Sequence, residues 1–340
     1  MEEKRVRKIE IVLNDFGQYL GANQENFVLY ENGESIKEVP FHKLDQVILT
    51  PGNTISTDAL FWCSLYDVNV MMTSNTGRNL SMMNPIAHNK NVETRMKQYE
   101  AYENEKGVEI AKAILKAKIE NQGALLEKLG SDSHKLNVID ELENVEGKNI
   151  EEVRNKLVYG IEGKCSRTYN TQLMTQFPEF LQVKKRNKYK AEEPLNNTFN
   201  LAYEVLKAEV YRGVMKAHLD PFLGYLHSIQ YSKPSLVCDL QEPFRPMIDE
   251  FLIKYSQDLD KDDFEKRGER MFLNQEKGYE LIQSVNELLD KRVEHQRITN
   301  FGESSKIRTM IREEAIKLSQ YLKGEKEEYK LVSKNKNLLS

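Results

Sequence analysis

The first eighty or so residues consist of short apolar runs separated by polar turn residues, a pattern typical of β-strands. Five runs qualify as strands: Ile9–Leu13 and residues 27–30, 35–39, 46–49 and 68–73. Asn32-Gly33 lies between the second and third runs and predicts a tight hairpin, because both residues tolerate positive φ angles. Ser56 is placed to cap the amino end of a short helix. These signals predict a small β-rich domain over residues 1–85.

From about Asn91 onward, apolar positions recur with the period of an α-helix almost to the end of the chain. The segments that predict helices are 108–129, 149–169, 194–217, 244–259, 276–296 and 305–323. We expect residues 86–106 to form a linker, 107–324 a helical domain, and 325–340 a charged tail that frays. The predicted fold class is therefore α+β, a small N-terminal β-rich domain followed by a larger all-α-helical domain.

Composition and charge narrow the class of protein. The chain has 340 residues, which suggests two domains, and 30% of them are charged with no apolar run of bilayer length, so we expect no membrane span. The first ten residues lack the apolar core of a signal peptide, which predicts a cytoplasmic protein. A net charge of −4 is unusual for a nucleic-acid-binding protein, but local basic patches can bind phosphates. A mildly acidic enzyme with another substrate remains the alternative.

Glu162 is the first candidate for chemistry, because it lies between Gly160 and Gly163 in a predicted helix. Each glycine costs a helix roughly 0.5–1 kcal/mol relative to alanine. Glycines allow close approach by another backbone or by a ligand, so Glu162 is a candidate metal ligand; the alternative is a helix crossing with a solvated glutamate. His227 ends a mostly apolar run, and is either a ligand or a satisfied core histidine.

Asp239 and Glu242 form a second acidic candidate just before a predicted helix. Their spacing resembles a capping box, with Asp239 as the N-cap and Glu242 in the first turn. Residues three apart also share a helix face, so both carboxylates could face one site. Two carboxylates and a neutral imidazole are reasonable ligands for Mg²⁺ or Mn²⁺, whereas the three scattered cysteines give no pattern for structural zinc.

A basic segment precedes the long helix that begins at Pro194. It is a candidate phosphate contact, or alternatively a solvated loop. The positive residues, with Tyr189 interleaved, are Lys184, Lys185, Arg186, Lys188 and Lys190.

Three motifs together resemble the CRISPR-associated integrase-nuclease family, that of the first numbered Cas protein. Residues 160–163 (GIEG), with Arg167 and Tyr169 downstream, are similar to its glutamate motif. Residues 219–227 (LDPFLGYLH) resemble its histidine motif, and residues 235–246 (SLVCDLQEPFRP) its acidic motif. The motifs follow the family's order and approximate spacing. The resemblance covers nearly the whole chain, and further similar segments are residues 39–44, 67–70, 77–78 and 111–122.

This resemblance implies that Glu162, His227 and Glu242 are both catalytic and the ligands of Mg²⁺ or Mn²⁺, with Asp239 a neighbouring acid. It also implies a homodimer, a complex with the small second CRISPR-associated protein, and DNA as the substrate. Arg245 is expected either to steady Glu242 or to pair with another nearby acid. Lys233 is expected to contact DNA or to face solvent.

The resulting hypothesis is an integrase and DNA endonuclease of CRISPR adaptation. It would join the 3′ ends of foreign DNA fragments to the repeat array by metal-dependent transesterification. Two alternatives stay open: a hydrolytic metal-dependent nuclease without integration, and a non-catalytic DNA-binding scaffold.

Overall fold

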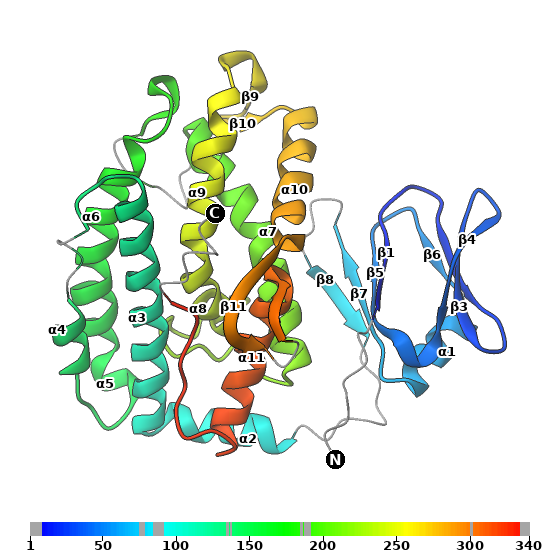
Figure 1. Cartoon of the computed structure of the whole chain (residues 1–340), viewed down its shortest axis with the longest axis horizontal. Coiled ribbons are helices and arrows are strands. Elements are labelled where there is room, and N and C mark those ends of the chain that lie inside the picture. The colour runs from blue at the N-terminus through cyan, green and yellow to red at the C-terminus, as the bar shows by residue number, and fades with distance from the viewer. Residues whose placement is uncertain are drawn as a thin grey trace. The chain divides into compact units, whose positions relative to one another are not determined.

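The computed structural model describes residues 9–74, 79–83, 92–133, 136, 138–183, 186, 192–299 and 302–333. The chain divides into two compact units, Met1–Lys90 and Asn91–Ser340. The first is rich in strands and the second is mainly helical (Figure 1). The predicted α+β class is confirmed.

The N-terminal unit contains two four-stranded sheets, ordered β1-β5-β7-β8 and β4-β3-β2-β6 (Figure 1). All five predicted strands are present, and three more were missed. The elements are β1 (Ile9–Leu13), β2 (Tyr19–Ala22), β3 (Asn26–Glu31), β4 (Glu34–Pro40), β5 (Leu44–Leu49), β6 (Thr54–Ile55), α1 (Thr57–Leu65), β7 (Asn69–Thr73) and β8 (Asn79–Met83).

The predicted turn chemistry of this unit is confirmed. Asn32 and Gly33 connect β3 to β4 with φ angles of 51° and 84°, the left-handed pair that a two-residue hairpin requires. Ser56 accepts a 3.0 Å hydrogen bond from the backbone N–H of Ala59, and so caps α1. Alternate strand positions such as Leu13 and Phe27 are fully buried in the core of the unit.

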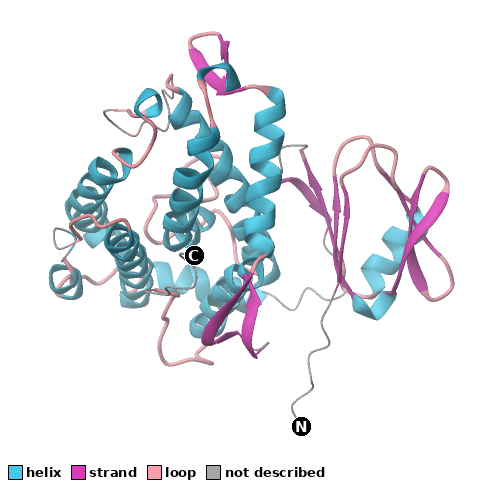
Figure 2. Ribbon diagram, turned by 45° about the horizontal axis from the view of Figure 1, so that its top comes forward, coloured by secondary structure: helices cyan, strands magenta, loops and turns pink. Residues whose placement is uncertain are grey.

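The second unit is a bundle of helices with two small hairpins (Figure 2). The segment predicted as one helix over 149–169 continues through three pieces, of which the middle one is π-helical. The elements are α2 (Val92–Tyr102), α3 (Glu105–Lys128), α4 (Ile139–Glu143), α5 (Ile150–Asn155), the π-helical η3 (Lys156–Glu162), α6 (Gly163–Met174), the 3₁₀ turn η4 (Glu179–Leu181), α7 (Pro194–Lys216), α8 (Ser235–Gln241), the 3₁₀ turn η5 (Glu242–Phe244), α9 (Arg245–Tyr255), the 3₁₀ turns η6 (Ser256–Asp258) and η7 (Lys261–Asp263), β9 (Phe264–Arg267), β10 (Arg270–Leu273), α10 (Gln275–Asp290), β11 (Arg292–Thr299), β12 (Gly302–Lys306) and α11 (Ile307–Leu322).

Four predictions for this unit need correction, the last of them for the charged tail. The helix expected through residue 296 ends at Asp290, and the β-branched positions Val293, Ile298 and Thr299 instead lie in strand β11, which pairs with β12. The unit is therefore not purely helical. Helix α2 fills most of the segment assigned to a linker, and its Gln98 side chain donates to the carbonyls of Asp220 (2.9 Å) and Leu223 (3.2 Å).

The described part of the charged tail, residues 325–333, does not fray as its composition suggested. Tyr329, Leu331 and Val332 are buried against the helical core, and the side chain of Asn121 on α3 donates to the Val332 carbonyl at 3.1 Å. These apolar residues bury enough surface to hold the segment in place despite its charged neighbours. Among the residues that the structure describes, no helix is long and apolar enough to cross a bilayer.

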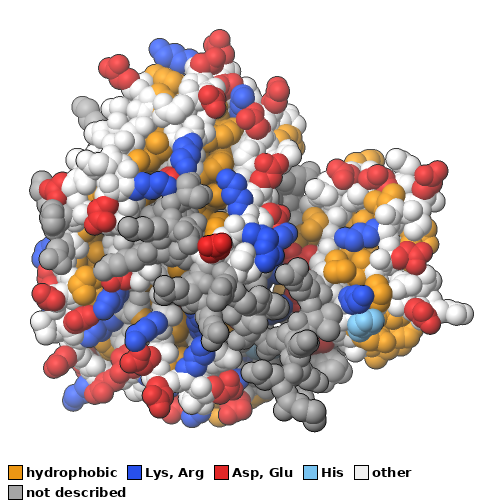
Figure 3. Space-filling model, viewed as in Figure 1, with side chains coloured by type: hydrophobic (Ala, Val, Ile, Leu, Met, Phe, Trp, Pro, Cys, Tyr) orange, Lys and Arg blue, Asp and Glu red, His pale blue; other side chains and the backbone are white. Residues whose placement is uncertain are grey.

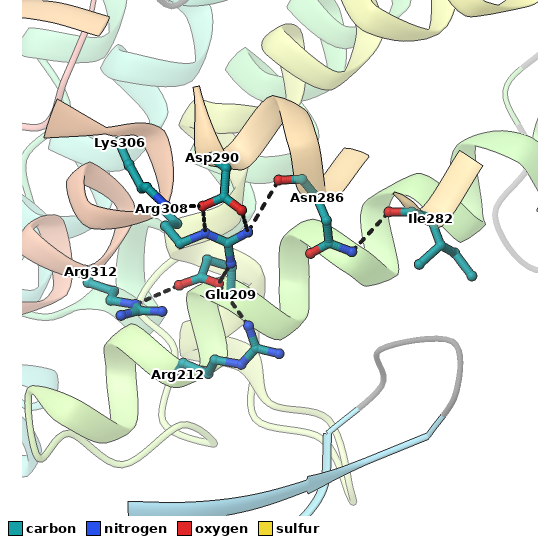
Figure 4. A network of polar contacts seen from close by, with 8 residues as sticks. All are labelled: Glu209, Arg212, Ile282, Asn286, Asp290, Lys306, Arg308 and Arg312. Atoms are coloured by element: carbon teal, nitrogen blue, oxygen red, sulfur yellow. Dashed lines mark hydrogen bonds and ion pairs between the residues drawn. The ribbon is translucent and has the colours of Figure 1, made fainter. Parts of the chain in front are cut away.

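A buried ion cluster joins α7, α10 and α11 (Figure 4). Glu209 is fully buried and contacts the guanidinium groups of Arg212, Arg308 and Arg312. Arg308 extends the cluster to Asp290 at the carboxyl end of α10.

Candidate active site

Two of the three proposed ligands, Glu162 and Glu242, converge on one buried cation. The ammonium of Lys118, from the middle of α3, lies 2.6 Å from Glu162 Oε1 and 2.7 Å from Glu242 Oε2. One turn further along α3, Asn121 donates a 2.8 Å hydrogen bond to the Pro243 carbonyl and fixes the turn that carries Glu242. The packing of α3 against η3 and η5 thus brings together carboxylates that lie eighty residues apart in the sequence.

Glu162 is the last residue of the π-helical segment η3. Gly160 and Gly163 weaken the preference for regular α-helix around it, and π-helical turns often occur at functional sites. A Cβ added to Gly160 would meet no heavy atom within 4 Å, so the expected close approach by another backbone does not occur there within the described chain. Ser166 Oγ, one turn onward, donates to Glu162 Oε1 at 2.9 Å and holds the carboxylate toward Lys118.

Glu242 is only 1% exposed, yet it is surrounded by positive charge. Burial alone would raise the pKa of its carboxyl group. The charges of Arg245 and Lys118 outweigh that effect and lower the pKa to about 2. For Lys118, likewise, burial would lower the pKa, but Glu242 and Glu162 together raise it. Glu242 is therefore ionised at neutral pH.

Asp239 does not cap the helix as the capping box predicted. It lies inside α8, fully buried, and its carboxylate accepts hydrogen bonds from the backbone N–H groups of Tyr225 (2.6 Å), Leu226 (2.9 Å) and His227 (2.8 Å). A Cβ on Gly224 would lie 2.9 Å from Asp239 Oδ2 and 2.7 Å from the backbone of Ser235, so this approach requires glycine. The spacing of Asp239 and Glu242 fits a capping box, but residues 225–227 come back to the Asp239 carboxylate and take the place of the helix N–H groups.

Asp239 also orients the imidazole of His227. Asp239 Oδ1 lies 2.7 Å from Nδ1, while Nε2 lies 3.9 Å from Glu242 Oε1. A proton on Nδ1 donated to Asp239 leaves the Nε2 lone pair directed toward Glu242, an arrangement that ligating histidines commonly use. The imidazole is partly exposed, as is Glu162.

The three proposed ligands fit a hard divalent cation in their chemistry: two carboxylates on one cation position and an imidazole beside them. Within the described ranges, no three His, Cys, Asp or Glu side chains are already grouped as an ion requires. Lys118 stands between the two carboxylates instead.

Arg245 was expected either to steady Glu242 or to pair with another acid, and the structure shows the first. Its guanidinium contacts Glu242 Oε1 at 2.6 Å and lies over the ring of Tyr203, 5.0 Å from the centroid. The hydroxyl groups of Tyr203 and Tyr169 (2.6 Å) both donate to the buried Asp249. Burial raises the pKa of Asp249 to about 6, against the lowering effect of these hydrogen bonds and of nearby arginines.

Sequence reasoning missed Lys118, Ser166, Tyr203 and Asp249. For Lys118 a signal existed, since it occupies a core position of α3, four residues after Ile114 and seven before Leu125, both fully buried. A lysine on the apolar face of a helix indicates a buried anion, because an unpaired buried ammonium is unstable.

The basic segment is only partly described. Arg186 donates to the side-chain oxygens of Asn196 (2.8 Å) and Asn200 (2.9 Å) and lies over the rings of Phe199 and Tyr203, so it is held inside the helical unit rather than presented to phosphate. Lys184, Lys185, Lys188 and Lys190 lie outside the described residues. Lys233 is half-buried. On the face in Figure 3, acidic and basic side chains alternate over the helical unit.

Comparison with known proteins points to one family. The family model described as CRISPR associated protein Cas1 matches residues 11–287. A CRISPR-associated endonuclease Cas1 of Korarchaeum cryptofilum is 30% identical over 264 residues, 72% of this chain and 77% of the relative. A second, from Archaeoglobus fulgidus, is 30% identical over 315 residues, 85% of this chain and 90% of the relative.

Solved structures agree on the fold. A casposase bound to integration product has a TM-score of 0.70 at 23% identity and covers 94% of this chain and 92% of its own. A Cas1 protein from Thermotoga maritima has a TM-score of 0.68 at 20% identity, with 95% and 99% covered. Because the family model matches most of this chain, the chain belongs to the Cas1 family of CRISPR-associated proteins.

Proposed function

We propose that this protein is a cytoplasmic integrase and DNA endonuclease of CRISPR adaptation. It joins the 3′ ends of foreign DNA fragments to the repeat array by transesterification and cleaves DNA when water replaces the 3′-hydroxyl. The observation that carries the proposal is the convergence of Glu162 and Glu242 on one buried cation position beside His227. The relatives named endonuclease support the nuclease activity, and the casposase bound to integration product supports strand joining.

Glu162, His227 and Glu242 are the proposed ligands of Mg²⁺ or Mn²⁺. When bound, the ion would neutralise charge on the scissile phosphate and lower the pKa of the attacking hydroxyl. The chain's own residues prepare these ligands: Asp239 presents Nε2 of His227, Arg245 fixes one oxygen of Glu242, and Ser166 holds Glu162. Such fixed groups suit phosphoryl transfer, which depends mainly on positioning and electrostatics.

The proposed partners are DNA, a second copy of this chain and the small Cas2 protein. Complexes that contain Cas1 and Cas2 share this fold, with a TM-score of 0.72 for one of them. The homodimer rests on the family resemblance.

The test replaces Glu162 with alanine and supplies a fragment with a free 3′-hydroxyl and a repeat-containing plasmid. We expect joining and cleavage in Mg²⁺ or Mn²⁺, none in EDTA, and a loss of about 100-fold or more in the variant. Glu141→Ala is the matched control, because that carboxylate is exposed and pairs only loosely with Lys164 at 3.3 Å. Joining that survives in Glu162→Ala refutes the metal site, and cleavage without joining identifies a hydrolytic nuclease.

A further inference from the structure

Glu162 and Glu242 are already matched in charge by the two cations in direct contact with them. Glu162 and Glu242 contribute two negative charges, and Lys118 and Arg245, both in direct contact with them, contribute two positive charges. Lys118 is 6% exposed and Glu242 is 1% exposed, so solvent screens this group weakly. A divalent cation added while Lys118 and Arg245 both stay in contact with the two glutamates places further positive charge in a weakly screened site, which is unfavourable.

The two cations of the cluster differ in how firmly they are held. Arg245 approaches one oxygen of Glu242 from three residues away on the same chain segment, and its guanidinium is stacked on the ring of Tyr203. Lys118 is held through its terminal ammonium by the two carboxylates, at the end of a flexible four-carbon stem. Lys118 is therefore the cation that can leave, and it occupies one oxygen of each proposed carboxylate ligand.

We propose that Lys118 is a built-in counter-cation of the metal site, which binds Glu162 and Glu242 in competition with the divalent ion. With no metal bound, the ammonium holds the two carboxylates together and neutralises their repulsion. When the metal binds, the ammonium moves off the carboxylates, so the metal affinity of the protein reflects the difference between the two cations. This inference rests on the proposed metal site and assigns Lys118 a positioning role within it.

The test measures metal binding rather than activity. Mn²⁺ is titrated into the full-length protein by calorimetry, and thermal unfolding is recorded with and without Mn²⁺. The variants Lys118→Met and Lys118→Gln both remove the competing charge; the second keeps an N–H donor for a carboxylate and guards against a folding defect. The control is Lys116→Met, because Lys116 lies on the same helix but pairs with the exposed Glu143 at 2.6 Å.

We expect both Lys118 variants to bind Mn²⁺ at least about tenfold more tightly than the wild type, the result of losing one buried competing charge. Their melting temperatures should fall without Mn²⁺ and recover more than that of the wild type when it is added. An affinity equal to or weaker than that of the wild type in both variants overturns the role of Lys118. Mn²⁺ binding by the wild type that Glu162→Gln does not weaken overturns the metal site itself, and with it this inference.

Discussion

Two buried glutamates of the helical unit have similar electrostatics and different surroundings. Glu209 in the cluster of Figure 4 and Glu242 at the candidate site are both almost fully buried. In each, burial would raise the pKa, and neighbouring cations instead lower it to about 2. A strongly shifted pKa therefore does not by itself distinguish a structural carboxylate from a functional one.

The difference lies in the partners. Glu209 is enclosed by guanidinium groups, with Arg312 Nε at 2.6 Å from one oxygen and Arg212 and Arg308 each at 2.9 Å from the other. These rigid guanidinium groups link the helices and contact both oxygens of Glu209, so neither oxygen is open to another cation. Glu242 instead shares a lysine with a second, partly exposed carboxylate, beside a partly exposed imidazole. A lysine shared by two carboxylates, next to partly exposed groups, distinguishes the candidate site from the cluster around Glu209.

The largest expected effect is on stability, at Glu209. Glu209→Gln removes the buried anion that three guanidinium groups share, although Arg308 keeps Asp290, so the helical unit should lose about 3–5 kcal/mol of unfolding free energy. Urea unfolding followed by circular dichroism measures this loss. Strand transfer per folded molecule should remain, whereas Glu242→Gln should remove it. A Glu209→Gln variant that is stable but inactive would contradict the comparison.

A pH dependence follows from the same carboxylate. The folded pKa of Glu209 is about 2 and its ordinary value is 4.5, so its contribution to stability is present above pH 4.5 and is lost as the pH falls toward 2. At neutral pH this contribution is roughly 3 kcal/mol, since one pKa unit corresponds to about 1.4 kcal/mol. Urea unfolding of wild type and Glu209→Gln should therefore differ most at pH 7 and converge below pH 4. A constant difference across that range would show that Glu209 acts through packing alone.

The sequence anticipated local features better than partnerships formed in three dimensions. The Asn32-Gly33 hairpin and the long helices α3 and α7 follow from turn chemistry and period, and the structure confirms them. The pattern of Asp239 and Glu242 predicted a cap, because local spacing cannot show that residues 225–227 return to the Asp239 carboxylate. The three motifs of the family resemblance selected Glu162, His227 and Glu242, which periodicity alone left ambiguous.

Lys118 shows why the other residues of the candidate site could not be predicted from the sequence. Its place among the buried positions of α3 indicates a buried anion, but only the packing of η3 and η5 onto α3 shows that the anion is a pair of carboxylates, Glu162 and Glu242. Likewise, nothing in the sequence distinguishes Tyr203 and Asp249 from other residues of amphipathic helices. Their hydrogen bond forms only because α7 packs against α9.

The smallest expected effect concerns Ser166, which positions the carboxylate of Glu162. Ser166→Ala removes the 2.9 Å hydrogen bond to Glu162 Oε1. Glu209 has no such hydroxyl partner, because within the described chain its carboxylate is bonded only to guanidinium groups. One hydrogen bond contributes about 1 kcal/mol, which corresponds to roughly a fivefold decrease in strand transfer if it positions the carboxylate. Thr171→Ala is the matched control, because its hydroxyl lies on the same helix α6 and donates only to the Arg167 carbonyl, at 2.9 Å. Equal strand-transfer rates in the two variants would mean that water replaces the serine hydroxyl without loss, and that Lys118 alone fixes Glu162.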